Sequence, residues 1–557
     1  MKRSENRTLT FILILGVFFT AFLSGKGEDL QIQKKKIDAY LSGVYKKNMP
    51  GAAVLAVKKG KIVIRKGYGV ADMELDVPMA PEMVFRIGSI TKQFTSVGIM
   101  MLVEAGKVKL DDLITVYLKD YPLRGKMITV RHLLNHTSGI KSYTSMPEFQ
   151  KMMRKDLTVA ELIDVFKNEP FDFDPGDKYL YNNSGYILLG AIIKKVSGKK
   201  YADFIKEKIF NKAGMENSLY DNTAAIIKNR AKGYSGNKKD VVNASYISMS
   251  LPYAAGSLLS TVDDLYKWNR ALNSGKLISK KSLKEVYSRS KLNSGEEISY
   301  AFGFVNIDFH GFAQIHHGGG INGFITHASY FPEEEIFVTV LTNSTGNEIS
   351  PIFVSQWIST LLLGKPYTED SVKVLTEKEL DEYVGVYKIN SDEDRVVSRE
   401  GRKLFTQRSG SFKQECFCRS YDTFFFKNSF TWFTFERDKK DGKVIAMTMN
   451  SLSGKDRAKK TNKKVVEKKA VDIDKSIYKE LVGKYQMQGF EIVVSLDSGK
   501  LMLQATGQSA TELFPLSPLK YFVKVVDAEI IFAKDTSGKV ISLTLLQGKV
   551  KMKGEKL

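Results

Sequence analysis

The spacing of apolar residues divides the chain into a mixed helical and strand-like first part and a strand-rich last part. Apolar positions recur with helical spacing over residues 30–45, and again over a helix that begins at Ser89 and ends near Gly106. Two alternating runs, 52–57 and 61–65, predict a hairpin around Lys58-Lys59-Gly60. Further helices are expected over 129–134, 159–167, 186–197, 201–208, 261–272 and 352–363, and strands over 313–316 and 336–342, which flank a glycine-rich loop.

Strands near both ends with helices between them favour an α/β (α+β) domain, in which an antiparallel sheet is joined to a helical subdomain. From about residue 375 the runs are short and strand-like, and they repeat. Val384-Gly385-Val386-Tyr387 recurs as Val482-Gly483-Lys484-Tyr485, and Gly442-Lys443-Val444-Ile445 recurs as Gly538-Lys539-Val540-Ile541. Each copy reads as an all-β barrel or lipocalin-like domain that closes its own edges. The predicted domains are 1–25, 30–365, 375–455 and 475–557, with a lysine-rich stretch between the last two.

The N-terminus has the pattern of a secretory signal. Lys2, Arg3 and Arg7 precede an apolar run over 9–23, which is short for a membrane-spanning helix. Residues 1–25 are therefore predicted to be a signal peptide, and the protein to be exported to the periplasm or secreted. An uncleaved N-terminal helix that anchors the protein in the membrane is the alternative.

Net charge and cysteine content limit the classes of partner and cofactor that the protein is expected to bind. The chain of 557 residues carries 84 Lys and Arg against 62 Asp and Glu, a net charge of +22. The basic residues are dispersed and no nucleic-acid motif accompanies them, so no nucleic-acid partner is expected. They predict a basic solvated surface, with association with an anionic cell envelope as the alternative. Cys416 and Cys418 are too few for a structural zinc site and too close for an unstrained disulfide, so no metal or other cofactor is predicted. The oligomeric state is not predicted.

Candidate chemistry begins at Ser89 and Lys92. Residues three apart share a helix face, so the amine can lie beside the hydroxyl. A serine needs an adjacent base to act as a nucleophile, and a lysine can be that base once burial lowers its pKa. The spacing alone is weak evidence, because Ser-x-x-Lys also occurs at Ser197/Lys200, Ser235/Lys238, Ser288/Lys291, Ser476/Lys479 and Ser517/Lys520.

Two downstream segments distinguish Ser89 from these other matches. Tyr181 and Asn183 stand in a loop before a helix, where a phenol can relay a proton and an amide can orient a lysine. His317-Gly318-Gly319-Gly320 follows a strand, and glycines there let a substrate backbone approach closely. The segment Ala255–Leu265 reads as a turn that leads into a capped helix.

These motifs, in this order, resemble the serine β-lactamase and penicillin-binding-protein superfamily, in particular its class C β-lactamase-like and D-aminopeptidase-like branch. The resemblance covers about residues 30–365. It implies an acyl-enzyme mechanism in which Ser89 attacks a carbonyl, Lys92 and Tyr181 share the acid and base roles, and Asn183 orients them. It also implies an oxyanion hole built from the backbone N–H groups of Ser89 and Gly320. The two C-terminal repeats resemble the paired barrels of some D-aminopeptidases.

His317 departs from the lactamase pattern, which has lysine at this position. We expect His317 and Gly319 to bind substrate, with the imidazole as a weaker and pH-dependent anchor for a carboxylate. The predicted function is therefore that of an exported serine hydrolase acting on an amide or ester, such as a small D-amino-acid peptide. Two alternatives are a β-lactamase or DD-peptidase, and a penicillin-binding sensor without turnover.

Overall fold

The computed structural model describes residues 30–146, 148–236, 240–367, 372–390, 393–451, 454–465, 468–487, 490–505, 510–548 and 550–557. The predicted signal peptide, residues 1–25, lies outside these ranges. In the part of the chain that the model covers, no helix combines the length and apolarity needed to span a bilayer.

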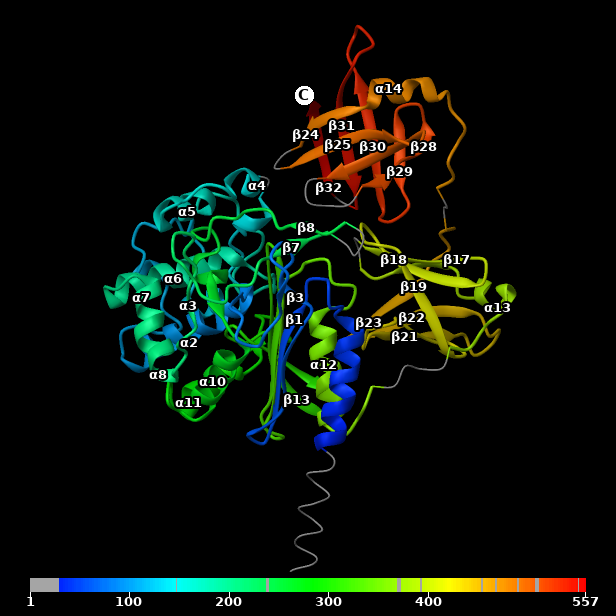
Figure 1. Ribbon diagram of the computed structural model, residues 1–557. Helices are drawn as coiled ribbons and strands as arrows, with labels where there is room; N and C mark the ends of the chain where they lie inside the picture. Colours follow the sequence, from blue (N-terminus) through cyan, green and yellow to red (C-terminus); the bar gives the residue numbers. More distant parts are fainter. Residues whose placement is uncertain are drawn as a thin grey trace, which may run out of the picture.

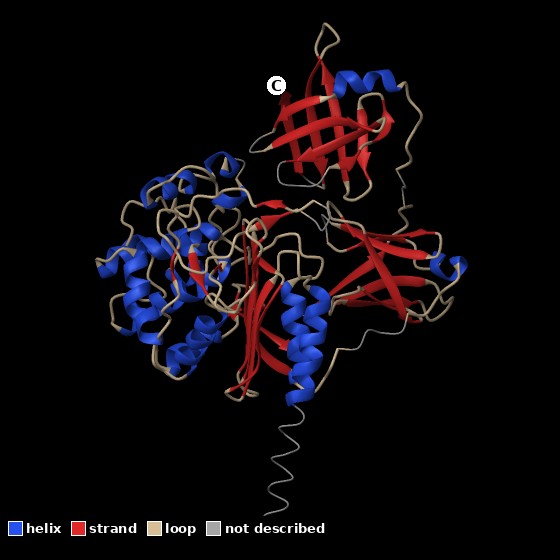
Figure 2. Cartoon of the chain, in the orientation of Figure 1, coloured by secondary structure: helices blue, strands red, loops and turns tan. Residues whose placement is uncertain are grey.

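A six-stranded antiparallel sheet forms the centre of the first domain (Figures 1 and 2). Its strand order is β12-β13-β14-β15-β1-β2, so the two ends of the domain meet where β1 pairs with β15. The strands are β1 (Ala52–Lys58), β2 (Lys61–Tyr68), β12 (Val305–Phe309), β13 (Phe312–Ile321), β14 (Phe324–Phe331) and β15 (Ile336–Thr342). The predicted hairpin around Lys58-Lys59-Gly60 is confirmed: Lys59 and Gly60 have φ of 49° and 74°, as a tight turn requires.

Two helices cover one face of the sheet, residues 30–44 and α12 (Pro351–Leu362). Ile37, Leu41, Val354 and Ile358 pack there against inward-facing strand residues. A larger helical region covers the other face and contributes most of the core. Its elements are η1 (Gly88–Ile90), α2 (Thr91–Glu104), η2 (Ile114–Val116), α3 (Val130–Leu134), η3 (Tyr143–Ser145), α4 (Phe149–Met152), α5 (Val159–Phe166), α6 (Asn183–Ser197), α7 (Tyr201–Ile205), η4 (Lys206–Phe210), α8 (Asn211–Ala213), α9 (Tyr253–Gly256), α10 (Val262–Asn273) and α11 (Lys280–Tyr287).

Short strands connect these helices: β3 (Val70–Asp72), β4 (Val77–Pro78), β5 (Phe85–Arg86), β6 (Leu219–Tyr220), β7 (Tyr234–Ser235), β8 (Val242–Asn243), β9 (Leu258–Ser260), β10 (Ser290–Lys291) and β11 (Glu297–Ile298). The prediction of a glycine-rich loop between two strands is wrong. Gly318, Gly319 and Gly320 lie inside β13, and the turn comes later, at Asn322-Gly323. The alternation of buried and exposed positions continues through these glycines, but residues without side chains carry no hydropathy signal, so the sequence pattern does not reveal it.

Two all-β units follow, as the repeat predicts. The first is a closed barrel of β16 (Gly385–Lys388), β17 (Asp394–Glu400), β18 (Lys403–Arg408), β19 (Gln414–Ser420), β20 (Thr423–Phe425), β21 (Trp432–Arg437), β22 (Val444–Ser451) and β23 (Gly454–Lys460), preceded by α13 (Glu377–Asp381). Strand β23 runs past residue 455, the expected end of this domain, and into the stretch expected to join the barrels.

The second unit is a nine-stranded, nearly closed barrel preceded by η5 (Lys475–Ile477) and α14 (Tyr478–Leu481). Its strands are β24 (Gly483–Gln486), β25 (Glu491–Asp497), β26 (Lys500–Ala505), β27 (Thr511–Glu512), β28 (Phe514–Ser517), β29 (Lys520–Val523), β30 (Ala528–Lys534), β31 (Val540–Gln547) and β32 (Val550–Lys556). The two copies share an equivalent hydrogen bond from a tyrosine to the backbone four residues earlier. The Tyr387 hydroxyl donates to the carbonyl of Tyr383 at 2.7 Å, and the Tyr485 hydroxyl donates to the carbonyl of Leu481 at 2.7 Å.

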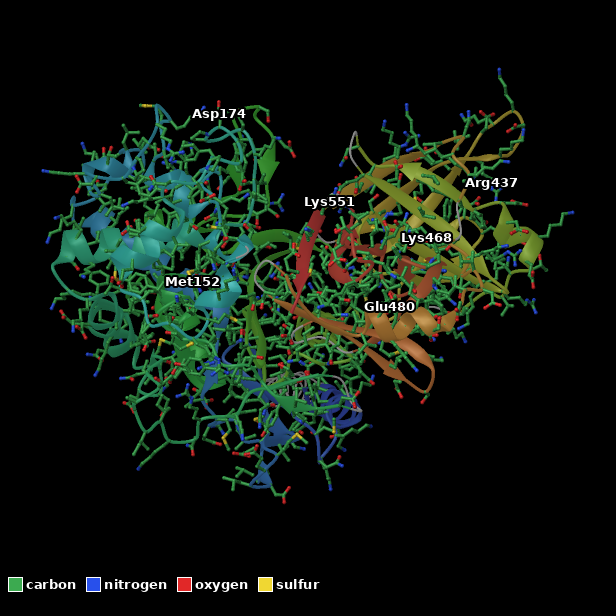
Figure 3. The ribbon with its side chains drawn as sticks, turned by 90° about the horizontal axis from the view of Figure 1, so that it is seen from above. Met152, Asp174, Arg437, Lys468, Glu480 and Lys551 are labelled. Carbon is green, nitrogen blue, oxygen red and sulfur yellow. The ribbon has the colours of Figure 1, made fainter. Side chains whose placement is uncertain are left out.

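The aromatic side chain of Phe430 in the first barrel packs against the first domain. The ring centroid of Phe430 lies 5.3 Å from those of Phe309 and Phe353 and 5.1 Å from that of Tyr367. Seen from above, Met152 and Asp174 lie on one lobe of the molecule and Arg437 on another (Figure 3). The two barrels touch each other through a bridge between Phe412 and Val526.

Candidate active site

Ser89 lies in a tight turn that ends at the start of a buried helix. It belongs to the 3-10 turn η1, directly before α2, rather than opening that helix as expected. Gly88 in this turn has a φ of +50°, and a Cβ there would come within 2.9 Å of the Gly320 nitrogen. Only glycine allows both this conformation and this close approach. The turn therefore holds the Ser89 backbone against β13.

Lys92 is fully buried, and its amine contacts the serine directly. The Lys92 Nζ atom lies 3.2 Å from Ser89 Oγ, 2.8 Å from Asn183 Oδ1 and 2.9 Å from the carbonyl oxygen of Ala255. The last two oxygens only accept hydrogen bonds, so they use two N–H bonds of the amine. In a neutral amine the lone pair is then left facing the serine hydroxyl, which is the arrangement that proton abstraction needs.

Burial favours this neutral form. It holds the pKa of Lys92 well below the usual value for lysine, because a buried ammonium loses its hydration. The rings of Tyr181 and Tyr186, whose centroids lie 4.8 and 5.4 Å from Nζ, attract a cation. Desolvation outweighs this attraction.

Tyr181 completes the group around the serine. Its hydroxyl oxygen is buried without a hydrogen-bond partner among the described residues. Burial raises the pKa of Tyr181, while the neighbouring Ser89 side chain acts to lower it. The phenol therefore stays protonated at neutral pH and has an O–H to donate next to Ser89.

Asn183 is fixed from both sides as the first residue of α6. Its Oδ1 accepts from Lys92, and its Nδ2 donates to Thr144 Oγ1 at 3.0 Å. The neighbouring Asn182 caps the helix by accepting from the Gly185 N–H at 2.8 Å. These contacts orient the amide oxygen toward the lysine.

The glycines of β13 lie against the serine turn. A Cβ on Gly319 would lie 2.0 Å from the Ile87 carbonyl oxygen and 2.4 Å from Thr326 Oγ1, and these two oxygens are themselves hydrogen-bonded at 3.0 Å. Gly320 pairs with Ile325, one position before the pair that closes the turn. By antiparallel alternation its N–H turns away from β14, toward the free edge of β13 beside Ser89. The Gly320 nitrogen therefore lies against the turn that carries Ser89, and the oxyanion hole stays a prediction.

His317 is placed beside the site but is hydrogen-bonded at both ring nitrogens. Nδ1 lies 2.6 Å from the Gly318 carbonyl and must donate to it, so Nε2 accepts from the Tyr300 hydroxyl at 3.0 Å. Burial lowers the pKa of His317 to about 3. The imidazole is therefore neutral at neutral pH, and its role in substrate binding stays a prediction.

Sequence reasoning missed four contributors: the Ala255 carbonyl, Thr144, Tyr300 and His136. The His136 ring lies 4.4 Å from that of Tyr181, and its Nδ1 accepts from the Asn182 N–H at 3.1 Å, which holds the loop before α6. Thr144, Tyr300 and His136 stand in no motif, and the contacts of all four residues join distant segments. The capped helix after Ala255 was expected, but not the use of that carbonyl.

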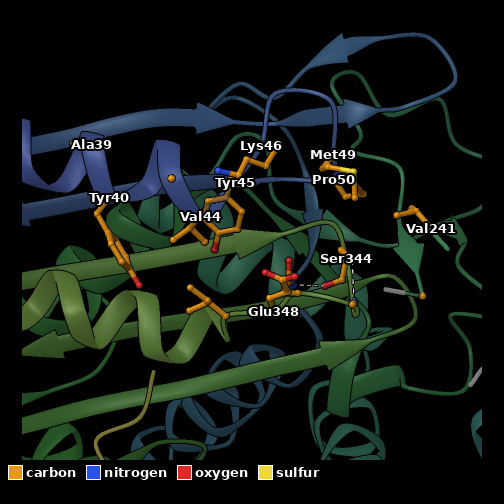
Figure 4. A pocket seen from close by; sticks show the side chains of 15 residues that line it. Ala39, Tyr40, Val44, Tyr45, Lys46, Met49, Pro50, Val241, Ser344 and Glu348 are labelled. Atoms are coloured by element: carbon orange, nitrogen blue, oxygen red, sulfur yellow. Dashed lines mark hydrogen bonds between the residues drawn. The ribbon is translucent and has the colours of Figure 1, made fainter. Parts of the chain in front are cut away.

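A separate hollow of about 380 Å³ lies at the end of the helix over 30–44, lined by Tyr45, Met49, Pro50, Ser344 and neighbouring residues (Figure 4). It contains none of the predicted site residues. Within the described ranges, no group of three or more His, Cys, Asp or Glu side chains is placed to hold a metal ion.

Comparisons with known proteins agree with this geometry. The family described as Beta-lactamase matches residues 33–351, and a domain of unknown function, DUF3471, matches residues 467–557. Penicillin-binding protein 4* of Bacillus subtilis is 29% identical, with 71% of this chain and 92% of that protein covered. The human mitochondrial serine beta-lactamase-like protein LACTB is 31% identical, but the match covers 40% of this chain and only 53% of that protein.

Solved structures of a penicillin-binding protein homologue and of an amidase are similar to this chain as well. The octameric penicillin-binding protein homologue from Pyrococcus abyssi is 27% identical with a TM-score of 0.56, over 76% of this chain and 99% of that one. D-amino acid amidase from Ochrobactrum anthropi SV3, complexed with D-phenylalanine, is 26% identical with a TM-score of 0.51, over 60% of this chain and 98% of that one.

Proposed function

Because the chain belongs to the beta-lactamase family, with more than half of its length matched, we propose that it hydrolyses an amide or ester through an acyl-enzyme formed on Ser89. The observation that carries the proposal is the set of contacts of Lys92. Two fixed acceptors leave its lone pair to the Ser89 hydroxyl.

The reaction follows from these positions. Ser89 Oγ attacks the carbonyl carbon as its proton passes to Lys92 Nζ, and the N–H groups of Ser89 and Gly320 stabilise the oxyanion. Tyr181 protonates the leaving group as the tetrahedral intermediate collapses and the acyl-enzyme forms, and the Lys92 ammonium then returns a proton to the Tyr181 oxygen. Water attacks the ester carbonyl as its proton passes to the neutral Lys92 amine, and that proton moves to Ser89 Oγ as the acid is released.

Among substrates we propose D-amino-acid derivatives. The structural similarity to D-amino acid amidase supports this class, and the neutral His317, in place of a lysine, makes a carboxylate anchor weak at neutral pH. A β-lactamase or DD-peptidase and a non-hydrolysing penicillin-binding sensor remain the alternative functions.

The test compares Ser89→Ala with Ser288→Ala, an exposed serine with the same Ser-x-x-Lys spacing outside the site. Hydrolysis of D- and L-aminoacyl amides, short-chain esters and β-lactams is measured together with fluorophosphonate labelling. We expect Ser89→Ala to lower the rate by about 10³-fold or more and to abolish labelling, while Ser288→Ala keeps both. Full activity of Ser89→Ala would contradict the proposal. Labelling of the wild type by a fluorescent penicillin without turnover would favour the sensor.

We also propose that the protein is exported, since basic residues precede an apolar run at its N-terminus. The full-length chain is expressed in a bacterial host, and the mature protein is sequenced from its N-terminus. A start near residue 26 in the extracytoplasmic fraction is expected. An intact N-terminus in the membrane fraction would support the anchored alternative instead.

A further inference from the structure

Two arginines lie opposite each other on the inner face of the first barrel. Arg395 of β17 pairs directly with Arg408 of β18 (Figure 1). Val397 and Thr406, two residues away on these strands, are 0% and 2% exposed. Because side chains alternate between the two faces of a strand, the arginines point inward as well. Directly opposed residues hold their Cβ atoms about 5 Å apart, where like charges are unfavourable. Negative charge beside the pair would therefore stabilise the barrel.

Acidic side chains supply only part of this charge. The Arg408 Nη2 atom forms an ion pair with Glu393. Among the described residues, Arg395 has no hydrogen-bond acceptor and no ion-pair partner for its guanidinium, although Asp456 and Glu393 act on it electrostatically. Burial and the charge of Arg408 outweigh that effect and lower the pKa of Arg395. The Arg395 guanidinium is thus a partly buried cation whose N–H groups have no acceptor within the described ranges.

Two more hydrogen-bond donors lie on the same inner face. Arg408 Nε and Thr406 Oγ1 are buried, and neither atom has a hydrogen-bond partner in the part of the chain that the structure describes. Thr406 is two residues from Arg408 and therefore on the same face of β18. A buried donor without an acceptor is unfavourable. The group is reachable from solvent, since 42% of the Arg408 side-chain surface is exposed. An acceptor that enters the barrel mouth would satisfy these donors.

The second barrel shows that the fold does not require this polar group. Lys403-Leu404 recurs there as Lys500-Leu501, and the same offset aligns the two arginines and the threonine with apolar residues: Ile492, Ala505 and Leu503. Ile492 pairs with Ala505 across β25 and β26, as the arginines pair in the first barrel. Ile492 and Leu503 belong to the core of the second barrel. The arginine pair is therefore specific to the first copy, which indicates a role other than closing the barrel.

We propose that the mouth of the first barrel binds a phosphate group through Arg395, Arg408 and Thr406. A phosphate monoester carries a charge of about −1.5 to −2 at pH 7 and three strong acceptor oxygens, which suits three side chains with unsatisfied donors. Guanidinium groups bind phosphate oxygens in a bidentate manner. The phosphate neutralises the opposed arginines, and its source is a soluble monoester or a lipid headgroup. The site contains none of the residues around Ser89, so it does not depend on the proposed hydrolase activity.

Isothermal titration calorimetry of the whole chain, at constant ionic strength in chloride, compares inorganic phosphate and glycerol 3-phosphate with acetate. We expect both phosphates to bind saturably and about tenfold or more tightly than acetate. The double variant Arg395→Ile/Arg408→Ala copies the second barrel, and it should bind phosphate about tenfold or more weakly than the wild type. Arg457→Ala removes a cation from the outer face of the same barrel, where Arg457 is paired with Glu436, and it should bind phosphate as the wild type does.

Asp456→Asn tests the electrostatic part of the proposal. Since Asp456 acts on Arg395 without pairing with it, removal of its charge should tighten phosphate binding by about twofold or more, and weaker binding would contradict the proposal. Thermal unfolding verifies that the variants are folded. In phosphate-free buffer the double variant should be at least as stable as the wild type, because the like-charge pair is gone. Added phosphate should raise the unfolding temperature of the wild type but not that of the double variant.

Vesicles distinguish the two sources of the phosphate group. Phosphatidylcholine vesicles with and without phosphatidic acid are sedimented with the wild type and with the double variant. Binding of glycerol 3-phosphate identifies a soluble ligand. Binding to phosphatidic acid that the double variant loses, without binding of glycerol 3-phosphate, identifies a lipid headgroup. The proposal is overturned if the double variant binds the three phosphate probes as tightly as the wild type, or if the wild type binds none of them.

Discussion

The chemistry of the site depends on how two acceptors and the Ser89 hydroxyl share the two N–H bonds and the lone pair of one amine. Asn183 Oδ1 and the Ala255 carbonyl fix two N–H bonds of Lys92, and burial disfavours a third. Among the described residues, the position of the two acceptors and the burial of the amine thus keep Lys92 neutral, and no carboxylate contacts it. A change of charge at Asn183 should alter the titration of Lys92 without moving the serine.

Asn183→Asp places a carboxylate in contact with the Lys92 amine, which stabilises the ammonium form and raises the pKa of Lys92. Since the base acts only when neutral, the acid limb of kcat/KM should move to higher pH, by about one to three units. The measurement is the pH profile of kcat/KM with a neutral ester. Asn183→Ala, which adds no charge, should lower the rate without this shift. A limb that stays in place in Asn183→Asp would show that Lys92 is not the titrating base.

Most residues of the site could be predicted from sequence because they belong to ordered motifs. Ser89 and Lys92 are three residues apart, and Tyr181 and Asn183 are two apart. The Ala255 carbonyl could not be predicted, since it reaches Lys92 across 163 residues and any residue type supplies a carbonyl. Tyr300 was missed for the same reason: its partner His317 is brought near by the register of β12 and β13, and no local pattern contains this register.

At the scale of elements, the decisive contact is that between strand β13 and the turn η1. The helices at 129–134, 159–167 and 261–272 were predicted well because their N-caps, Thr129, Thr158 and Thr261, lie next to apolar repeats. Strand β13 was cut short in the prediction because three glycines hide its alternation. Those glycines let the strand approach Ile87 and Gly88, directly before Ser89, more closely than any side chain would allow.

Gly319→Ala tests this packing. Its Cβ would overlap the Ile87 carbonyl oxygen, so strand and turn must separate. We expect a loss of about 1–3 kcal/mol in the free energy of unfolding and a fall of about 10²-fold in kcat. Thermal unfolding and steady-state kinetics measure the two effects. Gly318→Ala is the matched control, because the nearest atoms to its Cβ lie 3.6 Å away, at ordinary contact distance. Equal effects of the two variants would refute the packing argument.

The whole molecule is three bodies joined by a few specific contacts. Phe430, in the loop between β20 and β21, inserts into an aromatic group on the hydrolase domain. The barrels meet where the Gln547 side chain donates to the Gly410 carbonyl at 2.9 Å, beside the Phe412–Val526 bridge. Since the described residues of the candidate site all lie in the first domain, loosening the contacts of the barrels should change the overall dimensions of the molecule and leave the rate of hydrolysis nearly unchanged.

Phe430→Ala removes the aromatic anchor. We expect a larger radius of gyration in small-angle scattering, faster proteolysis between residues 365 and 385, and near-normal kcat on a small ester. Ile445→Ala replaces an apolar residue in the same barrel that is 42% exposed, and it should leave the scattering curve unchanged. An unchanged scattering curve for Phe430→Ala would mean that other contacts hold the barrel.

In both barrels the first strand pairs with the last in an equivalent way, and this duplication has a consequence for how the chain reaches its fold. Tyr387 and Lys388 of β16 pair with Lys460 and Lys459 of β23, as Tyr485 and Gln486 of β24 pair with Lys556 and Glu555 of β32. On dilution from denaturant, β32 can compete with β23 for the edge of β16, which is strand exchange between copies. During synthesis the first barrel is complete before the second emerges from the ribosome. The order of translation therefore favours pairing of the first and last strands within each copy.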